Sequence, residues 1–251
     1  MESTDFIYGA RAVIEAIEAG REIDKILISK DVHSDLISEL IVKARQADVV
    51  VRRVPAEAVN RVTRRNHQGV VAFLSAIIYH KLENLVPELY EAGMLPFLVV
   101  LDGITDVRNL GAIARTAECA GADAIVIPRL GSASVGADAV KTSAGALNHI
   151  PVCRERDIPW VIRYLKDNGY KVVAVTEKTD INFTTVDYTT PTALVLGSED
   201  TGLSSEALRL CDTKVAIPMF GKIGSLNVSV AAGVAIYEVV RQRLEANLEV
   251  I

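Results

Sequence analysis

Adjacent carboxylates follow an apolar run in the stretch LVLGSEDTGL, residues 194–203. Glu199 and Asp200 form a pair suited to proton transfer or to binding a cation. A structural interpretation is equally open, because Asp200 is also a residue type that begins a turn before the next helix. The stretch taken alone does not decide between acid–base chemistry and turn formation.

A second stretch, DGITDVRNLGAIAR (residues 102–115), places one cation among small and apolar residues. Asn109 is a type that caps helices, here one expected to begin at Leu110. Arg115 follows in the second turn, where so apolar a context calls for a partner. Glu118 offers an ordinary helix-surface pair, and a bound ligand is the other interpretation.

A third stretch, GKIGSLNVSVAAGVAIYEVVRQRL (residues 221–244), joins a glycine-containing loop to a long apolar segment. Ser225 is a preferred N-cap type, and Asn227 interrupts the apolar surface near its start. A structural interpretation, in which this is a capped core helix and Asn227 only closes its end, is also open. Apolar residues then recur at three- and four-residue intervals, which predicts a helix. Because little of this helix is polar, we expect it to be buried on more than one side.

The three stretches lie in a segment where strands and helices alternate. The expected strands are residues 97–101, 124–127, 150–153, 171–175, 193–196 and 214–217, and the other expected helices are residues 110–120, 159–167 and 204–211. Runs that are apolar on both faces are typical of buried parallel strands. We therefore predict an α/β fold in which helices cover both faces of a parallel sheet. Ligands of such sheets bind beyond the carboxyl ends of the strands, where these stretches lie.

The N-terminal part alternates in the same way and predicts a small α/β unit. Its expected helices are residues 8–19, 34–47 and 56–62, and its expected strands are residues 23–28, 49–54 and 70–78. A polar stretch with Pro87 and Gly93 follows and marks a junction. We divide the chain into residues 1–78, a linker of residues 79–94, and a second domain of residues 95–251.

Composition limits the class of protein. With 251 residues, 50% of them hydrophobic, the chain can bury a sizeable core. No apolar run reaches the roughly 18 residues of a membrane span, and no signal-peptide pattern opens the chain, so we expect a cytoplasmic protein without a membrane partner. The three cysteines and four histidines lack the spacing of a metal site or a disulfide framework, and we expect no metal.

Basic residues are concentrated in one region of an acidic chain. The net charge of -5 argues against a protein that coats nucleic acid. From Lys43 to His67, however, seven basic residues accompany two acidic ones, a local balance of +5. Such a cluster is usually a solvated surface, but most of its cations are arginines, whose forked guanidinium groups fit phosphates. We predict a polyanion contact here. The arginines expected to make it are Arg52, Arg53, Arg61, Arg64 and Arg65.

Two common nucleotide-binding motifs are absent. Gly221 and Lys222 are followed by Ile223, so the Ser or Thr of a P-loop is missing. No GxGxxG sequence follows an expected strand. P-loop NTPase chemistry and this mode of dinucleotide binding are therefore not predicted.

Together the three stretches resemble the three motifs of the SpoU (TrmH) family of RNA ribose 2′-O-methyltransferases, within the SPOUT superfamily. The match covers residues 102–115, 194–203 and 217–238 in the family's order, and SLNVSVAAGVAIYE and LGSEDTGLS are long patterns. The segments FIYGARAVIEAI and NHQGVVAF are similar to the RNA-recruiting domain of the 23S ribosomal RNA guanosine 2′-O-methyltransferases, from which Arg11 departs. The resemblance thus covers nearly the whole chain.

The resemblance implies S-adenosylmethionine as methyl donor, an RNA substrate, a deep trefoil knot in the second domain and a homodimer. The positions implied to hold the cofactor, largely through backbone groups, are Thr176, Gly197, Ile217, Met219, Ser225 and Leu226. The residues implied to be catalytic are Asn109, Arg115, Glu199, Ser225 and Asn227. Among these, Arg115 is expected to orient the ribose and to stabilise the developing alkoxide, while the others position the surrounding loops.

The resemblance most specifically implies methyl transfer to a ribose 2′-hydroxyl of a guanosine in 23S ribosomal RNA. Residues 1–78 would then bind the RNA substrate, and residues 95–251 would form the methyltransferase domain. Two alternatives stay open. One is a transfer-RNA 2′-O-methyltransferase of the same family, and the other is a non-catalytic module for RNA binding or ribosome assembly.

Overall fold

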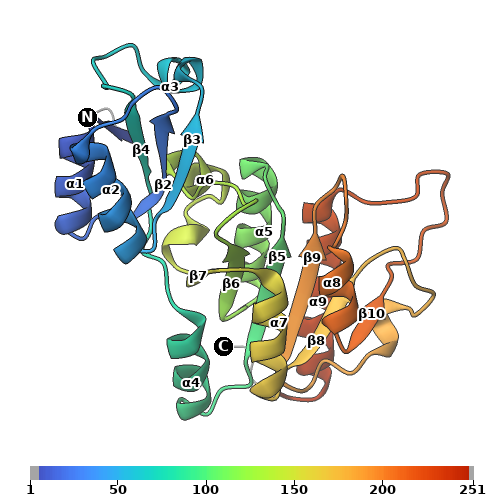
Figure 1. The fold of residues 1–251 in the computed structure, drawn as a ribbon. Helices are drawn as coiled ribbons and strands as arrows, with labels where there is room; N and C mark the ends of the chain where they lie inside the picture. Colours follow the sequence, from blue (N-terminus) through green and yellow to red (C-terminus); the bar gives the residue numbers. More distant parts are fainter. Residues whose placement is uncertain (1–5, 249–251) are drawn as a thin grey trace. The chain divides into compact units, whose positions relative to one another are not determined.

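The computed structural model describes residues 6–248, and the chain forms two compact units (Figure 1). The first unit extends to Ile78 and also includes Ser134–Asp138. The second contains Tyr79–Ala133 and the chain from Ala139 onward. Each unit is built around a sheet of its own. Among the described residues, no helix is long and apolar enough to cross a membrane.

The first unit has a four-stranded sheet in the order β1-β4-β2-β3. Its strands are β1 (Phe6–Tyr8), β2 (Ile23–Ser29), β3 (Val50–Val54) and β4 (Val70–Leu74), and its helices are α1 (Ala10–Glu18), α2 (Asp35–Gln46) and α3 (Ala56–Val62). β4 pairs antiparallel with β1 and β2, whereas β2 and β3 are parallel. The sequence predicts every element except β1, because three residues are too few to show a period.

A short segment from much later in the chain completes the first unit. Val135 is fully buried, and its N–H donates a hydrogen bond to Asp24 Oδ2 at 3.0 Å. Its carbonyl accepts from the Ala76 N–H at 2.8 Å. The first of these contacts joins residues 111 positions apart. It cannot be predicted when the chain is divided into contiguous ranges, as in the sequence analysis.

The second unit has a six-stranded, wholly parallel sheet in the order β10-β8-β9-β5-β6-β7. Its strands are β5 (Phe97–Asp102), β6 (Ala124–Pro128), β7 (Val152–Glu155), β8 (Lys171–Val175), β9 (Thr192–Gly197) and β10 (Thr213–Val215). The four inner strands are almost wholly buried, as expected for strands with helices on both faces. The predicted parallel α/β fold is confirmed.

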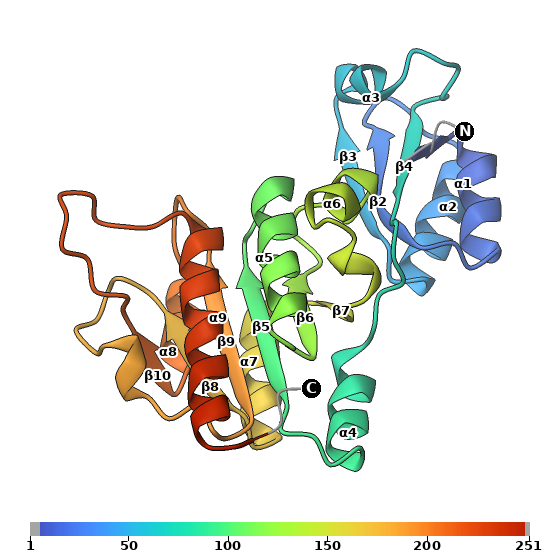
Figure 2. The ribbon, with the colours of Figure 1, turned by 180° about the vertical axis from the view of Figure 1, so that it is seen from behind.

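Helices cover both faces of this sheet (Figures 1 and 2). On one face lie α5 (Val107–Cys119) and α9 (Val228–Glu245), which pack against each other. On the other lie α4 (Leu82–Glu91), α7 (Ile158–Asp167) and α8 (Ser205–Leu210). A short helix, α6 (Ala137–Thr142), precedes β7. We call residues 102–115, 194–203 and 221–244, singled out in the sequence, the three chemical stretches. The first and the last lie on the α5–α9 face, and residues 194–203 begin in β9 and continue in the loop after it.

Residues 79–94, expected to be a polar linker, contain the helix α4. Four of its side chains are buried in the core of the second unit, namely Leu82, Leu85, Val86 and Leu89. Glu155 Oε1 accepts from the Leu82 N–H at 2.8 Å, which fixes the start of the helix. Burial raises the pKa of the Glu155 carboxyl. Polar residues and Pro87 between the buried positions hid the helical period from the sequence analysis.

α5 and α9 begin at other residues than those predicted. The N-cap of α5 is Asp106, and the N-cap of α9 is Asn227. The capping roles predicted for Asn109 and Ser225 are therefore wrong, whereas the alternative that Asn227 closes the start of the helix is confirmed. All four residues are types that N-caps favour, so the choice depends on where the backbone turns and not on the side chain. Asn109 is thereby free to make contacts outside its own helix.

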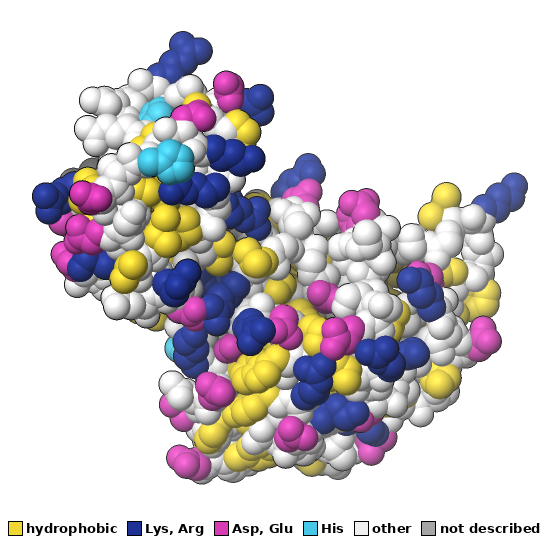
Figure 3. Space-filling view, in the orientation of Figure 1, with side chains coloured by type: hydrophobic (Ala, Val, Ile, Leu, Met, Phe, Trp, Pro, Cys, Tyr) yellow, Lys and Arg dark blue, Asp and Glu magenta, His cyan; other side chains and the backbone are white. Residues whose placement is uncertain are grey.

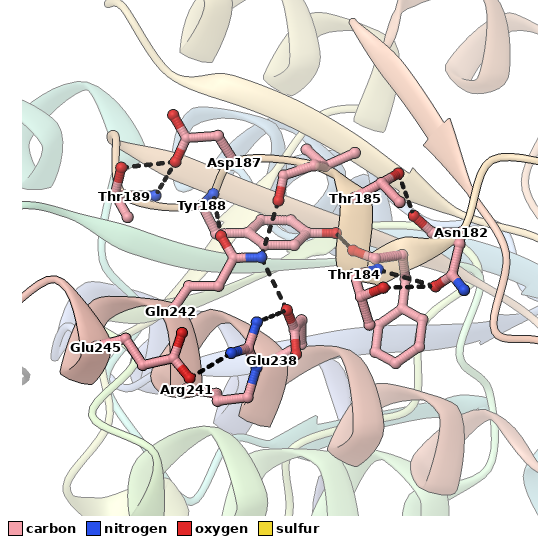
Figure 4. Close-up of polar contacts among 12 residues, drawn as sticks. Asn182, Thr184, Thr185, Asp187, Tyr188, Thr189, Glu238, Arg241, Gln242 and Glu245 are labelled. Carbon is pink, nitrogen blue, oxygen red and sulfur yellow. Dashed lines mark hydrogen bonds and ion pairs between the residues drawn. The ribbon is translucent and has the colours of Figure 1, made fainter.

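A hydrogen-bond network ties the C-terminal half of α9 to the chain that precedes β9 (Figure 4). Gln242 Nε2 donates to Val186 O at 2.9 Å, and Gln242 Oε1 accepts from the Tyr188 N–H at 3.0 Å. Glu238 accepts from both Gln242 and Arg241 at 2.8 Å. The Arg241 guanidinium holds the pKa of Glu238 below its usual range. This network anchors the helix whose first turn forms part of the site below.

Candidate active site

A pocket of about 680 Å³ opens where β8 and β9 end. Its walls are the loops that follow β8, β9 and β10, together with the first turn of α9. This is the edge where parallel sheets bind ligands, and the volume is typical of small-molecule sites, roughly 300–1,000 Å³. Within residues 6–248, no group of three or more His, Cys, Asp or Glu side chains is placed to hold a metal ion.

Every residue predicted to hold a cofactor lines this pocket. These residues are Thr176, Gly197, Ile217, Met219, Ser225 and Leu226. Thr176 is buried directly after β8, where its N–H donates to Val215 O at 2.9 Å. Its Oγ1 accepts from the Lys178 N–H at 3.3 Å. These two bonds fix the loop after β8 against the end of β10 and so shape this wall of the pocket.

The chain folds back tightly after Gly197. A Cβ atom at this position would lie 2.2 Å from backbone atoms of Gly202 and Leu203, so only glycine fits. Gly202 has a φ of +66°, in the left-handed region that favours glycine. Together these glycines let the loop return onto the end of β9. The carboxylate of Glu199, within that loop, is thereby placed in the lining of the pocket.

Asn227 joins the three chemical stretches at the edge of the pocket. Its Nδ2 donates to Asn109 Oδ1 on α5 at 3.1 Å and to Glu199 Oε1 in the loop after β9. Its Oδ1 accepts from the Ser229 N–H at 2.9 Å and so caps α9. Glu199 Oε1 also accepts from the Val228 N–H at 3.3 Å. One amide side chain therefore connects segments that lie 118 and 28 positions away from it in the sequence.

Arg115 lies apart from this cluster. Six residues beyond Asn109, it is about 9 Å further along α5, and it does not line the pocket. Its side chain is exposed and, among the residues that the structure describes, it forms no ion pair or hydrogen bond, not even with Glu118. The chain thus brings together Asn109, Glu199, Ser225 and Asn227 and leaves the Arg115 guanidinium available to a ligand.

A second arginine on α5 is held by its neighbour. Arg108 Nη2 and Nε donate to the Asp106 carboxylate at 2.8 and 3.3 Å. The hydrogen bonds from Arg108 lower the pKa of Asp106 to about 2. Sequence analysis missed this pair, whose only local signal is an acidic N-cap two residues before an arginine. The pair fixes a cation next to Asn109.

Comparison with known proteins decides the family. Residues 96–237 match the family described as the SpoU rRNA Methylase family, and residues 6–80 match the domain described as RNA 2′-O ribose methyltransferase substrate binding. The chain belongs to the SpoU methylase family. The resemblance on which the sequence analysis relied is therefore confirmed, and the protein is an RNA methyltransferase that uses S-adenosylmethionine.

Relatives of this methyltransferase are similar over most of their length. A protein of Staphylococcus saprophyticus named "Putative TrmH family tRNA/rRNA methyltransferase" is 36% identical over 94% of this chain and 95% of its own. The AdoMet-bound rRNA methyltransferase of Sinorhizobium meliloti has a TM-score of 0.60 at 28% identity, over 94% of this chain and 86% of its own. The TrmH/SpoU tRNA modifying enzyme of A. aeolicus has a TM-score of 0.57 at 30% identity, over 66% of this chain and 85% of its own.

The pocket of the methyltransferase has the chemistry that S-adenosylmethionine requires. Apolar side chains such as Leu196, Ile217 and Leu226 offer surfaces for the adenine ring. Glu177 and Lys178 supply both signs of charge, which complement the ammonium and carboxylate groups of the methionine part. Sequence analysis missed these two charges, because nothing in the sequence distinguishes them from other exposed residues. The residues present therefore fit the cofactor.

The arginines predicted to contact RNA lie in the first unit, and all are exposed. They are Arg52, Arg53, Arg61, Arg64 and Arg65. Arg53 Nη1 donates to the carbonyls of Ser29 and Val32 at 3.0 and 2.7 Å, so part of its guanidinium already supports a loop. Arg52, which precedes it in β3, points to the opposite face of the sheet. Arg61 and Arg64 instead line one open hollow of about 910 Å³. Figure 3 shows many Lys and Arg side chains over this unit.

Proposed function

We propose that this methyltransferase modifies the ribose 2′-hydroxyl of a guanosine in large-subunit (23S) ribosomal RNA, as a cytoplasmic homodimer. The observation that carries the proposal is the bridge from Asn227 to Asn109 and Glu199 at the edge of the pocket. It holds all three motif loops in one arrangement, while Arg115, further along α5, has no hydrogen bond or ion pair among the described residues and is available to a substrate.

The chemistry needs a positioned hydroxyl more than a strong base. S-adenosylmethionine supplies an activated methyl group, and an alcohol must be held close to it and lose its proton during attack. A guanidinium stays protonated in proteins, so Arg115 does not accept that proton. It instead donates hydrogen bonds to the ribose or to a neighbouring phosphate and stabilises the negative charge that develops on the oxygen. Asn109, Glu199 and Asn227 hold the loops around the donor.

Ribosomal RNA is favoured over transfer RNA by the extent of the similarities. The rRNA methyltransferase of S. meliloti is similar over 94% of this chain, whereas the A. aeolicus enzyme, named for tRNA, is similar over 66%. The substrate-binding domain, which is matched at residues 6–80 and carries the exposed arginines, makes up a large part of this chain. A separate domain with an open hollow, lined by Arg61 and Arg64 as well as by Glu57 and neutral residues, suits a large, folded RNA, whose phosphates it contacts without reading sequence.

An exposed apolar stripe on α9 supports the homodimer. Val230, Val234 and Tyr237 are 52%, 37% and 51% exposed and lie three or four residues apart, on one side of the helix. Within a single chain α9 is therefore buried on one side only, and the predicted burial on further sides requires a partner. In a two-fold dimer the same stripe of both copies would pack together and be buried. The trefoil knot implied by the resemblance is part of the same proposal.

Methyl transfer can be mapped directly in cells. Total RNA from a strain without the gene should lack one ribose methylation in 23S ribosomal RNA, located by mass mapping, and the purified protein with S-adenosylmethionine should restore it. A missing methyl group in transfer RNA would instead identify the transfer-RNA alternative. A protein that binds RNA but transfers no methyl group to either RNA would identify the non-catalytic module.

Replacement of Arg115 by Lys tests the assigned chemistry. Lysine keeps the charge but loses the fork that orients ribose and phosphate, so we expect kcat to fall at least about tenfold with an unchanged affinity for S-adenosylmethionine. If only the KM for RNA rises while kcat is kept, Arg115 binds RNA and does not assist the reaction.

Replacement of Tyr237 by Arg tests the dimer. A cation in an apolar interface should shift the protein to monomer in light scattering. Val42→Arg is a matched control, because Val42 is 55% exposed on α2, in the first unit. A folded Tyr237 variant that remains dimeric would exclude α9 from the interface.

A further inference from the structure

The loop between β10 and α9 carries apolar side chains that its own chain leaves uncovered. Phe220 is 98% exposed and Ile223 is 74% exposed. The intervening residues, Gly221 and Lys222, are also exposed. Figure 3 shows hydrophobic side chains together with Lys or Arg at this protruding loop, which is the orange segment leading to α9 in Figure 1. We call residues 220–223 the tip of the loop.

The tip adjoins the cofactor pocket without lining it. Met219 on one side of the tip and Gly224 on the other both line the pocket, whereas residues 220–223 do not. A substrate that enters the pocket on the side of Met219 and Gly224 therefore passes close to the tip. Since the substrate of this enzyme class is RNA, the groups nearest to the tip during the reaction are the target nucleotide and its neighbours in the strand.

The chemistry of the tip fits a single-stranded RNA. An aromatic ring stacks on an unpaired base whatever its identity, because every base has a π-face. The Lys222 ammonium forms no ion pair among the described residues and is available to the adjoining phosphate. Gly221 and Gly224 have no atom within 4 Å of an added Cβ, so the loop backbone is unconfined and can adjust to a strand.

We propose that Phe220 is a stacking platform for an unpaired base next to the methylated nucleotide, with Lys222 contacting the phosphate between them. The proposal rests on the RNA methyl transfer described above and adds a substrate-positioning residue to it. The other candidate occupant is a second copy of this chain. Lysine is depleted in protein interfaces, and the surface that suits a second copy is the purely apolar stripe on α9, so the mixed tip favours RNA.

Kinetics with matched variants test the platform. Phe220→Ala, Phe220→Tyr and Ile223→Ala are compared, using as substrate the total RNA extracted from a strain without the gene. Loss of one aromatic–base stack is expected to raise the KM for RNA about 10- to 100-fold in Phe220→Ala. Phe220→Tyr should retain the wild-type KM, and Ile223→Ala, which removes an exposed side chain that cannot stack, should change little. Affinity for S-adenosylmethionine alone should be unchanged in all three.

Tryptophan fluorescence reports base stacking directly, and a purely structural role of Phe220 would not make it respond to RNA. The chain has one tryptophan, Trp160, which stacks on Tyr164 at 5.3 Å, far along the chain from the loop. In a Trp160→Phe background, Phe220→Trp should be quenched by the same RNA, because a stacked base quenches indole emission.

Three results would overturn the proposal of a stacking platform. An unchanged KM for Phe220→Ala would show that no base stacks there. Weaker binding of S-adenosylmethionine without RNA would make Phe220 a cover for the cofactor, and conversion to monomer in light scattering would place it in the dimer interface. Failure of the wild-type protein to methylate any RNA would refute the proposed function itself, and it is scored separately from these variants.

Discussion

Replacement of Asn227 by Asp separates two tasks that this side chain performs. Asp keeps the Oδ1 acceptor that caps α9, and Asp is as good an N-cap as Asn. It removes the Nδ2 donor to Asn109 and Glu199 and sets a second carboxylate against Glu199. If capping were the main task, Asn227→Asp would behave like the wild type.

The structure gives the expected magnitude. A hydrogen bond to a charged group contributes about 1.5–3 kcal/mol, and since Asn227 and Glu199 are both exposed, we take the lower end. Two unit charges 4 Å apart in water repel by about 1 kcal/mol more. The sum, about 2–3 kcal/mol, predicts that S-adenosylmethionine binds roughly 30- to 150-fold more weakly, because the loops around the pocket lose their common anchor.

Calorimetric titration with S-adenosylmethionine measures this effect, and a second substitution tests its cause. In the double variant Asn227→Asp with Glu199→Gln, the amide and the carboxylate exchange places, so the hydrogen bond can re-form with its direction reversed. We expect the double variant to bind at least tenfold more tightly than Asn227→Asp, a recovery of about 1.4 kcal/mol. Wild-type affinity in Asn227→Asp, or no recovery in the double variant, would refute the bridge.

Three further predictions follow from other parts of the chain. Gly197→Ala should abolish binding of S-adenosylmethionine, because its Cβ would lie 2.2 Å from neighbouring backbone, whereas Gly221→Ala meets nothing within 4 Å and should bind normally in the same titration. Gln242→Ala should lower the free energy of unfolding in urea by about 1–3 kcal/mol, because it leaves two backbone groups unpaired, while Glu245→Ala, which removes an exposed ion pair, should cost under about 1 kcal/mol. Burial raises the folded-state pKa of Glu155 above 4.5, so the stability that its neutral form gives is complete below pH 4.5 and is lost as the pH rises through the folded-state pKa. Urea unfolding at a series of pH values should therefore show the free energy of unfolding of Glu155→Gln rising relative to that of the wild type from about pH 4.5 upward. A difference between the two proteins that does not change with pH would contradict this.

Local sequence patterns were enough to predict the strands of the second unit and the stretches that meet at the edge of its sheet, although the order of the strands is known only from the structure. Each inner strand contains a run of four or five consecutive apolar residues, and the apolar residues of α9 recur at helical spacing. These are local signals, because burial on both faces or on one side of a helix fixes which residue types recur within a few positions. The cofactor pocket follows from the same facts, since the carboxyl ends of parallel strands share one edge.

Which side chains within those stretches contact each other could not be predicted from the sequence and follows from the folded structure. Asn227 had the same capping propensity as Ser225, and it became the bridge because two segments 118 and 28 positions away arrive beside it. Gly197 is required because the loop after β9 folds back and brings the backbone of Gly202 and Leu203 against it. Arg115 has no partner among the described residues, although Glu118 lies one turn further along the same helix. Such outcomes depend on where chain segments cross, and crossings are set by the packing of the whole sheet and its helices, not by any local period in the sequence.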